Sequence, residues 1–115
     1  MFEYILGELT VKKIDYVVLD ISGLGYKIYI SLKTFEILDE VGSDEKLYIY
    51  TKVKEDDISY YGFKNENERE LFKALISISG VGPKLALAIL STYNVKEIID
   101  IVLDSNAKLF TKVPG

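Results

Sequence analysis

The sequence of 115 residues contains neither cysteine nor histidine. The lack of cysteine excludes a disulfide framework and fits a reducing compartment. Together the two absences remove the usual zinc ligands, the Cys–His nucleophilic pair and the imidazole general base. We therefore expect no cofactor, no zinc site of the usual kind and no catalysis that depends on imidazole or thiolate.

The sequence also lacks a targeting segment and a long apolar run. An early acid, Glu3, interrupts the N-terminus, which does not show the charged-then-apolar pattern of a signal peptide. No apolar run approaches the ~18 residues that a membrane-spanning helix requires. These features predict a cytoplasmic protein that does not bind a membrane.

The net charge of −4 is unfavourable for a nucleic-acid-binding protein, because phosphate contacts supply most of the non-specific affinity. The acidic residues are concentrated in the first half of the chain. Residues 1–63 contain 12 acidic and 7 basic residues, whereas residues 64–115 contain 6 acidic and 7 basic residues. The second half therefore has no net repulsion toward phosphate.

The first half shows the two-residue alternation of short strands. Gly23-Leu24-Gly25 separates two of them as a hairpin, Gly7 is a candidate bulge in the first, and Val53 continues the inner face of the fourth. Five short strands in about sixty residues favour a closed barrel of the OB type, since an open sheet this small would expose its edges. The predicted strands are 2–13, 16–22, 26–31, 47–53 and 58–63, with a short helical turn at 32–38.

From Lys64 onward the apolar spacing becomes helical. Asn65 followed by Glu68, and Asn94 followed by Glu97, form the capping-box signature of a helix start. We expect helices at 65–77, 83–92 and 95–103, then a short helix capped by Ser105. The predicted fold class is a five-stranded OB-fold barrel followed by an α-helical domain, divided into residues 1–63 and 64–115.

Gly80-Val81-Gly82-Pro83-Lys84 connects the first two of these helices. Two glycines permit a tight reversal, and Pro83 suits the first position of the second helix. Backbone amides at a helix N-terminus bind anions, and Lys84 adds a charge-assisted contact. We interpret the segment as a helix-hairpin-helix motif that binds a DNA phosphate through Gly80, Val81, Gly82 and Lys84.

An alternative function comes from a different class of protein. Glycines between helices also serve as plain C-caps and connectors. The chain is then a protein-interaction or oligomerisation module in which the hairpin binds nothing. A nucleotide-binding loop is disfavoured, since no strand precedes the glycines and Leu85 stands where GxGxxG requires its third glycine.

The sequence resembles the RuvA family, the bacterial subunits that recognise four-way Holliday junctions. The resemblance runs from Met1 to Gly115, and its last block is highly specific. The matching blocks are Gly23-Leu24-Gly25-Tyr26, Lys54-Glu55-Asp56, Tyr61-Gly62-Phe63, Glu68-Arg69-Glu70-Leu71-Phe72 and Gly80-Val81-Gly82-Pro83-Lys84-Leu85-Ala86-Leu87-Ala88-Ile89-Leu90.

The resemblance implies a structure-selective DNA-binding subunit that supports branch migration in recombination, repair and the SOS response. It implies an OB-type barrel, two helix-hairpin-helix motifs and assembly into a homotetramer or octamer on four-way junction DNA. It also implies two protein partners, the ATP-driven motor RuvB, which binds a C-terminal domain, and the resolvase RuvC. Val113, Pro114 and Gly115 match the start of the second hairpin, so we expect the rest of that motif and the motor-binding domain to belong to a longer protein.

The acidic loop at Glu55, Asp56 and Asp57 has three interpretations. The resemblance implies that Glu55 and Asp56 form a pin near the fourfold axis, where their carboxylates repel phosphates at the junction centre. The residues alone are typical of a solvated acidic turn. A metal-dependent nuclease built on all three acids is disfavoured, because adjacent strand residues point to opposite faces.

Overall fold

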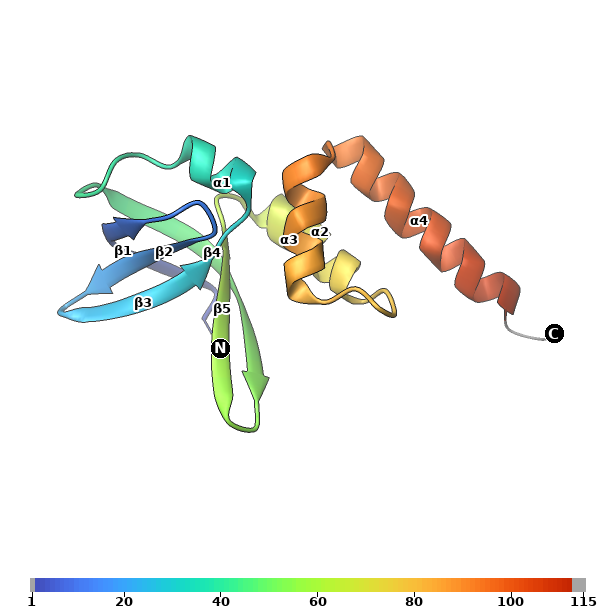
Figure 1. Cartoon of the computed structure of the whole chain (residues 1–115), viewed down its shortest axis with the longest axis horizontal. Coiled ribbons are helices and arrows are strands. Elements are labelled where there is room, and N and C mark those ends of the chain that lie inside the picture. Colours follow the sequence, from blue (N-terminus) through green and yellow to red (C-terminus); the bar gives the residue numbers. More distant parts are fainter. Residues whose placement is uncertain (1, 113–115) are drawn as a thin grey trace.

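The computed structural model describes the backbone of residues 2–112 and the side chains of residues 2–105. The strands gather in one half of the molecule and the three longer helices in the other, as Figure 1 shows. In chain order the elements are β1 (Tyr4–Lys12), β2 (Tyr16–Ile21), β3 (Leu24–Tyr29), α1 (Leu32–Ile37), β4 (Asp44–Lys54), β5 (Asp57–Phe63), α2 (Glu66–Ile76), α3 (Pro83–Thr92) and α4 (Val95–Lys112).

The five strands form a closed barrel in the order β1-β2-β3-β5-β4. β1 pairs with β4 to close it, and the pairing of β3 with β5 is parallel, with α1 in the connection between β3 and β4. Alternate side chains fill the interior, because successive residues of a strand point to opposite faces. The predicted barrel is therefore confirmed. Its core comprises Ile5, Leu9, Val17, Leu19, Ile28, Ile30, Leu38, Leu47 and Ile49.

Three details of the barrel differ from the sequence prediction. The β2–β3 hairpin turns at Ser22 and Gly23, whose φ values are 53° and 87°, so that Leu24 already belongs to β3. The irregularity of β1 lies between Leu9 and Val11 rather than at Gly7. Gly7 is instead a point of close approach, where a Cβ would lie 2.8 Å from the carbonyl oxygen of Asp20.

Val53 was expected on the inner face of the barrel, and this prediction is wrong. Its side chain is 67% exposed, and its cross-strand partner Ile58 is 55% exposed. Both lie where the β4–β5 hairpin extends past the end of the barrel, as Figure 1 shows. The alternation of the strand continues there, but no opposite wall remains to cover it.

The helices pack on the outside of the barrel through α2. Phe72 and Leu75 of α2 are fully buried, and the ring of Phe72 lies 5.0 Å from that of Phe63 and 5.4 Å from that of Tyr61. Aromatic pairs at such distances add stability beyond the area that they bury. This apolar contact joins the two halves predicted from the composition. In the part of the chain that the structure describes, no helix has the length and apolarity to cross a membrane.

The helix boundaries are confirmed for α2 and α3 but not for α4. Asn65 caps α2 and Gly82 precedes α3, as expected. α4 is one helix from Val95 to Lys112, so Ser105 lies inside it rather than at the start of a further helix. The serine has no proline or glycine beside it that would break the helix. Val113, Pro114 and Gly115 lie outside the described residues.

Candidate nucleic-acid interface

The connection between α2 and α3 is a tight loop built around Gly80. Gly80 has a φ of 87°, a left-handed conformation that residues with a Cβ adopt at a cost. The Val81 amide donates a hydrogen bond to Ile78 O at 3.0 Å, and the Val81 side chain packs against the helical core. Val81 therefore anchors the loop from inside, and its amide is engaged within the protein.

The N-terminus of α3 presents unpaired amides. The first amide of this helix with a backbone acceptor is that of Ala86, which donates to Gly82 O at 3.0 Å. Lys84 and Leu85 precede it in the first turn, where helix geometry offers their amides no acceptor. Within the described residues, no hydrogen bond from the amides of Gly80 or Gly82 is formed either.

The described part of the chain offers an internal comparison, since the N-termini of the other helices are closed. Ser31 caps α1 and Asn65 caps α2. At α4 the Glu97 amide donates to Asn94 Oδ1 at 2.9 Å. Gly82 makes no such side-chain bond. α3 is thus the described helix whose N-terminus is left available to an outside acceptor.

The surface in front of these amides is open. A Cβ placed on Gly80 or Gly82 would meet no atom within 4 Å. Gly82 has a φ of −88° and a ψ of 175°, which any residue can adopt, so the fold itself does not require glycine there. The Lys84 side chain is exposed beside it. A positive helix end, bare backbone and an exposed ammonium group together suit a phosphate oxygen.

The second predicted site, Glu55 and Asp56, forms the turn of the β4–β5 hairpin. Lys54 pairs with Asp57 in the last rung, and both turn carboxylates are exposed. Figure 1 shows this tip and the α2–α3 connection on the same lower side of the view, opposite α1. Within the described residues, no group of three acidic side chains is placed to hold a metal ion.

Polar contacts hold the barrel and the helices together at the joint, the region where α2 packs on the barrel. Arg69 Nη2 of α2 lies 2.8 Å from Glu3 Oε1, and Lys64 Nζ lies 2.7 Å from Glu45 Oε2. Burial acts to raise the pKa of Glu45, but bonds from Lys64 and the Asp39 amide bring that pKa below its ordinary value. The α2–α3 connection and the acidic tip of the β4–β5 hairpin therefore belong to one packed molecule.

A closed OB-type barrel joined to an open helix-hairpin-helix motif defines a class of nucleic-acid-binding architecture. Residues 1–62 match the model of the RuvA N terminal domain, and residues 72–115 match that of the SAM-like Helix-hairpin-helix tandem. The chain belongs to the RuvA family.

Several curated relatives carry the name Holliday junction branch migration complex subunit RuvA. The chain is 42% identical over 114 residues to that of Fusobacterium nucleatum, covering 99% of this chain and 58% of the relative. It is 42% identical to that of Syntrophus aciditrophicus and 40% to that of a Geobacter species, covering 100% of this chain and 56% and 58% of those relatives. The chain thus spans just over half the length of these relatives.

Proposed function

We propose that this chain is the junction-recognising part of a Holliday junction branch migration subunit. It belongs to a non-catalytic DNA-binding protein that supports a separate ATP-driven motor. The observation that carries the proposal is the open N-terminus of α3, where Gly82 and Lys84 face solvent without a capping side chain. Relatives of that name at about 40% identity over the whole chain support it.

The hairpin binds one DNA strand by its backbone. The amides of Gly80, Gly82 and Lys84 donate to phosphate oxygens, and the Lys84 ammonium group adds charge, while Val81 keeps the loop in shape from inside. Such contacts fix position without reading sequence. A single hairpin reaches few phosphates, so one protomer binds weakly.

Shape selectivity follows from assembly. In a homotetramer, four hairpins engage the four arms of a junction at once, which multiplies a weak affinity by multivalency. A linear duplex cannot satisfy four radially placed sites. An octamer encloses the junction from both faces in the same way.

Glu55 and Asp56 act as a pin at the centre of this assembly. Their exposure at the tip of a projecting hairpin suits that role. Two like charges ~4 Å apart in water repel by about 1 kcal/mol, and physiological salt screens this over ~8 Å. Copies that converge on one axis add their repulsion and keep the crossover strands apart.

The remaining partners complete the proposal. The full-length protein supplies a second hairpin and a further domain that binds RuvB, whose ATP hydrolysis drives migration. RuvC then cuts the junction held by the tetramer. The setting is cytoplasmic DNA recombination and repair, including the SOS response.

Binding of the full-length protein to a four-way junction and to a duplex of matched sequence tests the proposal. We expect tighter binding to the junction and a clear loss of affinity in Lys84→Glu. Lys96→Glu is the matched control, since Lys96 is exposed at the corresponding position of α4, whose N-terminus Asn94 closes. Equal affinity for junction and duplex would contradict the proposal, as would equal losses in the two variants.

A second function is favoured by one observation, the exposed apolar face of α4. Val95, Ile99 and Leu103 are 58%, 43% and 60% exposed at one-turn spacing, which suits a protein-interaction module. The salt dependence of DNA affinity separates the two functions. Four protomers that each hold one phosphate give a slope of about −3.6 in log K against log salt. A slope near zero with intact oligomers would favour the interaction module.

A further inference from the structure

The two capping boxes of this chain are alike in sequence but differ in structure. In α4 the box is reciprocal, because the Asn94 amide donates to Glu97 Oε1 at 3.0 Å and the Glu97 amide returns a bond at 2.9 Å. In α2 only half of the box forms, where the Glu68 amide donates to Asn65 Oδ1 at 2.8 Å. The Glu68 carboxylate does not turn back to its own helix, and it reaches the barrel half instead.

Two buried hydroxyl groups receive this carboxylate. Glu68 Oε1 accepts a bond from Ser31 Oγ at 3.0 Å and one from Thr34 Oγ1 at 3.4 Å. Ser31 and Thr34 are 1% and 0% exposed, at the start of α1. One oxygen atom thus links the first turn of α2 to the first turn of α1, across the joint between the helices and the barrel.

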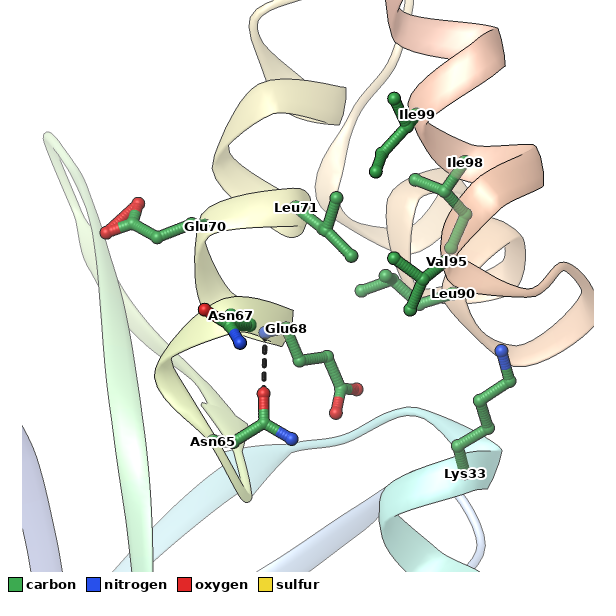
Figure 2. A pocket seen from close by; sticks show the side chains of 10 residues that line it. All are labelled: Lys33, Asn65, Asn67, Glu68, Glu70, Leu71, Leu90, Val95, Ile98 and Ile99. Atoms are coloured by element: carbon green, nitrogen blue, oxygen red, sulfur yellow. Dashed lines mark hydrogen bonds between the residues drawn. The ribbon is translucent and has the colours of Figure 1, made fainter.

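The packing beside this link is open. A groove of about 540 Å³ lies next to Glu68, with apolar walls from α2, α3 and α4 that include Leu71, Leu90 and Ile98. Figure 2 shows Glu68 leaving α2 toward the ribbon of α1, while the apolar side chains gather between α2 and α4. From the barrel half only Lys33 of α1 is among the residues that line this groove, so Glu68 reaches α1 at the edge of an open space rather than through a filled core.

Other contacts at the joint share in holding it. Arg69 of α2 donates to Glu3 O at 3.0 Å and to Glu3 Oε1 at 2.8 Å, at an exposed site before β1. The packing of Phe72 against β5 is apolar and non-directional, so it holds the halves together but tolerates rocking. The Leu32 amide donates to Ser91 Oγ at 2.9 Å, which ties α1 to the last turn of α3. Glu68 ties α1 to the first turn of α2. The bond to Ser91 and the bonds to Glu68 therefore hold α1 against the helices at two separate points of the joint.

We propose that Glu68 is a positioning residue, whose bonds to Ser31 and Thr34 set the orientation of the α2–α3 hairpin relative to the acidic tip of the β4–β5 hairpin. This inference rests on the proposed function, in which the hairpin holds phosphate and the tip faces the junction centre. Four-arm recognition requires each hairpin to stand at a fixed distance and angle from the axis. Glu68 supplies part of that rigidity from a position that DNA does not touch.

A distance measurement without DNA tests the positioning. The chain has no cysteine, so Lys54→Cys and Ser79→Cys place one spin label beside the acidic tip and one on the α2–α3 loop, both at exposed positions. Labelled chain is diluted with unlabelled chain, so that pulsed electron paramagnetic resonance reports the distance between the two labels within one protomer. We expect a narrow distribution in this background and a broader one after Glu68→Ala or Glu68→Asp.

Conservative and matched variants separate positioning from general stability. Both bonds end on one oxygen, so Glu68→Gln keeps an acceptor at the same place and should restore the narrow distribution. Glu97→Ala removes the equivalent residue of the α4 box and should leave the distribution narrow. The inference is overturned if Glu68→Ala leaves the distribution unchanged, if Gln behaves as Ala does, or if Glu97→Ala broadens it equally.

Binding by the full-length protein tests the link to recognition. We expect Glu68→Ala to lower the preference for junction over duplex about tenfold, with duplex affinity unchanged, because misplaced sites lose the multivalent gain. An unchanged preference despite a broadened distribution would overturn this role of Glu68. Equal affinity of the unmodified protein for junction and duplex would instead remove the proposed function, and the distance result would still stand.

Discussion

Gly80 and Gly82 flank Val81 in one loop, yet the backbone requires glycine at only one of them. Gly80 has a φ of 87°, whereas Gly82 has a φ of −88°. Neither position has an atom within 4 Å of an added Cβ. The fold thus explains the first glycine by conformation. The fold sets no such requirement at the second, where the proposed phosphate contact would account for a bare backbone.

Alanine at these two positions should therefore have different effects. We predict that Gly82→Ala leaves the free energy of unfolding within about 0.5 kcal/mol of the unmodified protein, as for most surface changes, but weakens junction binding. Its methyl group stands between the phosphate and the amides at the start of α3. Urea unfolding and a junction titration measure the two quantities.

Gly80→Ala is the companion variant. It should cost about 1–2 kcal/mol of stability, because a Cβ is forced into a left-handed conformation. If Gly82→Ala bound the junction as tightly as the unmodified protein, the bare surface at this position would have no role in phosphate binding.

The sequence predicts the hairpin well because its signals are local. Two glycines, a proline at the first helical position and an asparagine before α2 each determine their own turn of the chain, and the bounds of α3 follow from them. The barrel also follows from local alternation, since each strand shows its inner face. The hydrogen bond of the Val81 amide within the protein could not be predicted, because it depends on how tightly the loop closes on Ile78.

The partner of Glu68 could not be predicted, because the sequence gives Asn65-x-x-Glu68 and Asn94-x-x-Glu97 the same local signature. Only the fold brings Ser31 and Thr34 beside α2, at separations of 37 and 34 residues. The exposure of Val53 has the same origin, since alternation identifies a face but not whether anything covers it. Contacts between distant segments are what local patterns leave out.

The acidic tip gives a prediction about charge. Replacing Glu55 and Asp56 together by lysine turns phosphate repulsion into attraction. We predict tighter binding to the junction and a slower exchange of strands at the crossover. A titration with junction DNA measures the first, and motor-driven branch migration measures the second.

Glu36→Lys with Glu40→Lys is the matched control for the tip. Both acids are exposed, Glu36 in α1 and Glu40 in the segment that follows it. Figure 1 places α1 opposite the tip. The control changes the net charge by the same amount as the tip variant. The control should alter binding much less than the tip variant. A fall in affinity for the tip variant would contradict the pin.

The last prediction concerns pH and the Glu68 carboxylate. Burial raises the pKa of Glu68, while the bonds from Ser31 and Thr34 and the nearby charge of Lys33 partly oppose this. A pKa that is higher in the folded than in the unfolded protein adds stability below the unfolded value. This contribution is lost as the pH rises through the folded value. At neutral pH the charged carboxylate therefore works against folding.

We accordingly expect Glu68→Gln to be at least as stable as the unmodified protein at pH 7, and to lose this relative advantage at pH 4. Urea unfolding of both proteins at the two pH values measures the difference. Glu45 has a lowered pKa, so its contribution to the stability of the protein is lost as the pH falls. This contribution is the same in both proteins and cancels in the comparison. A difference between the two proteins that is the same at both pH values would show that Glu68 titrates alike in the folded and unfolded chain. The hydroxyl groups of Ser31 and Thr34 would then hold a carboxylate that remains well solvated, and the link between α1 and α2 would lie closer to water than its geometry indicates.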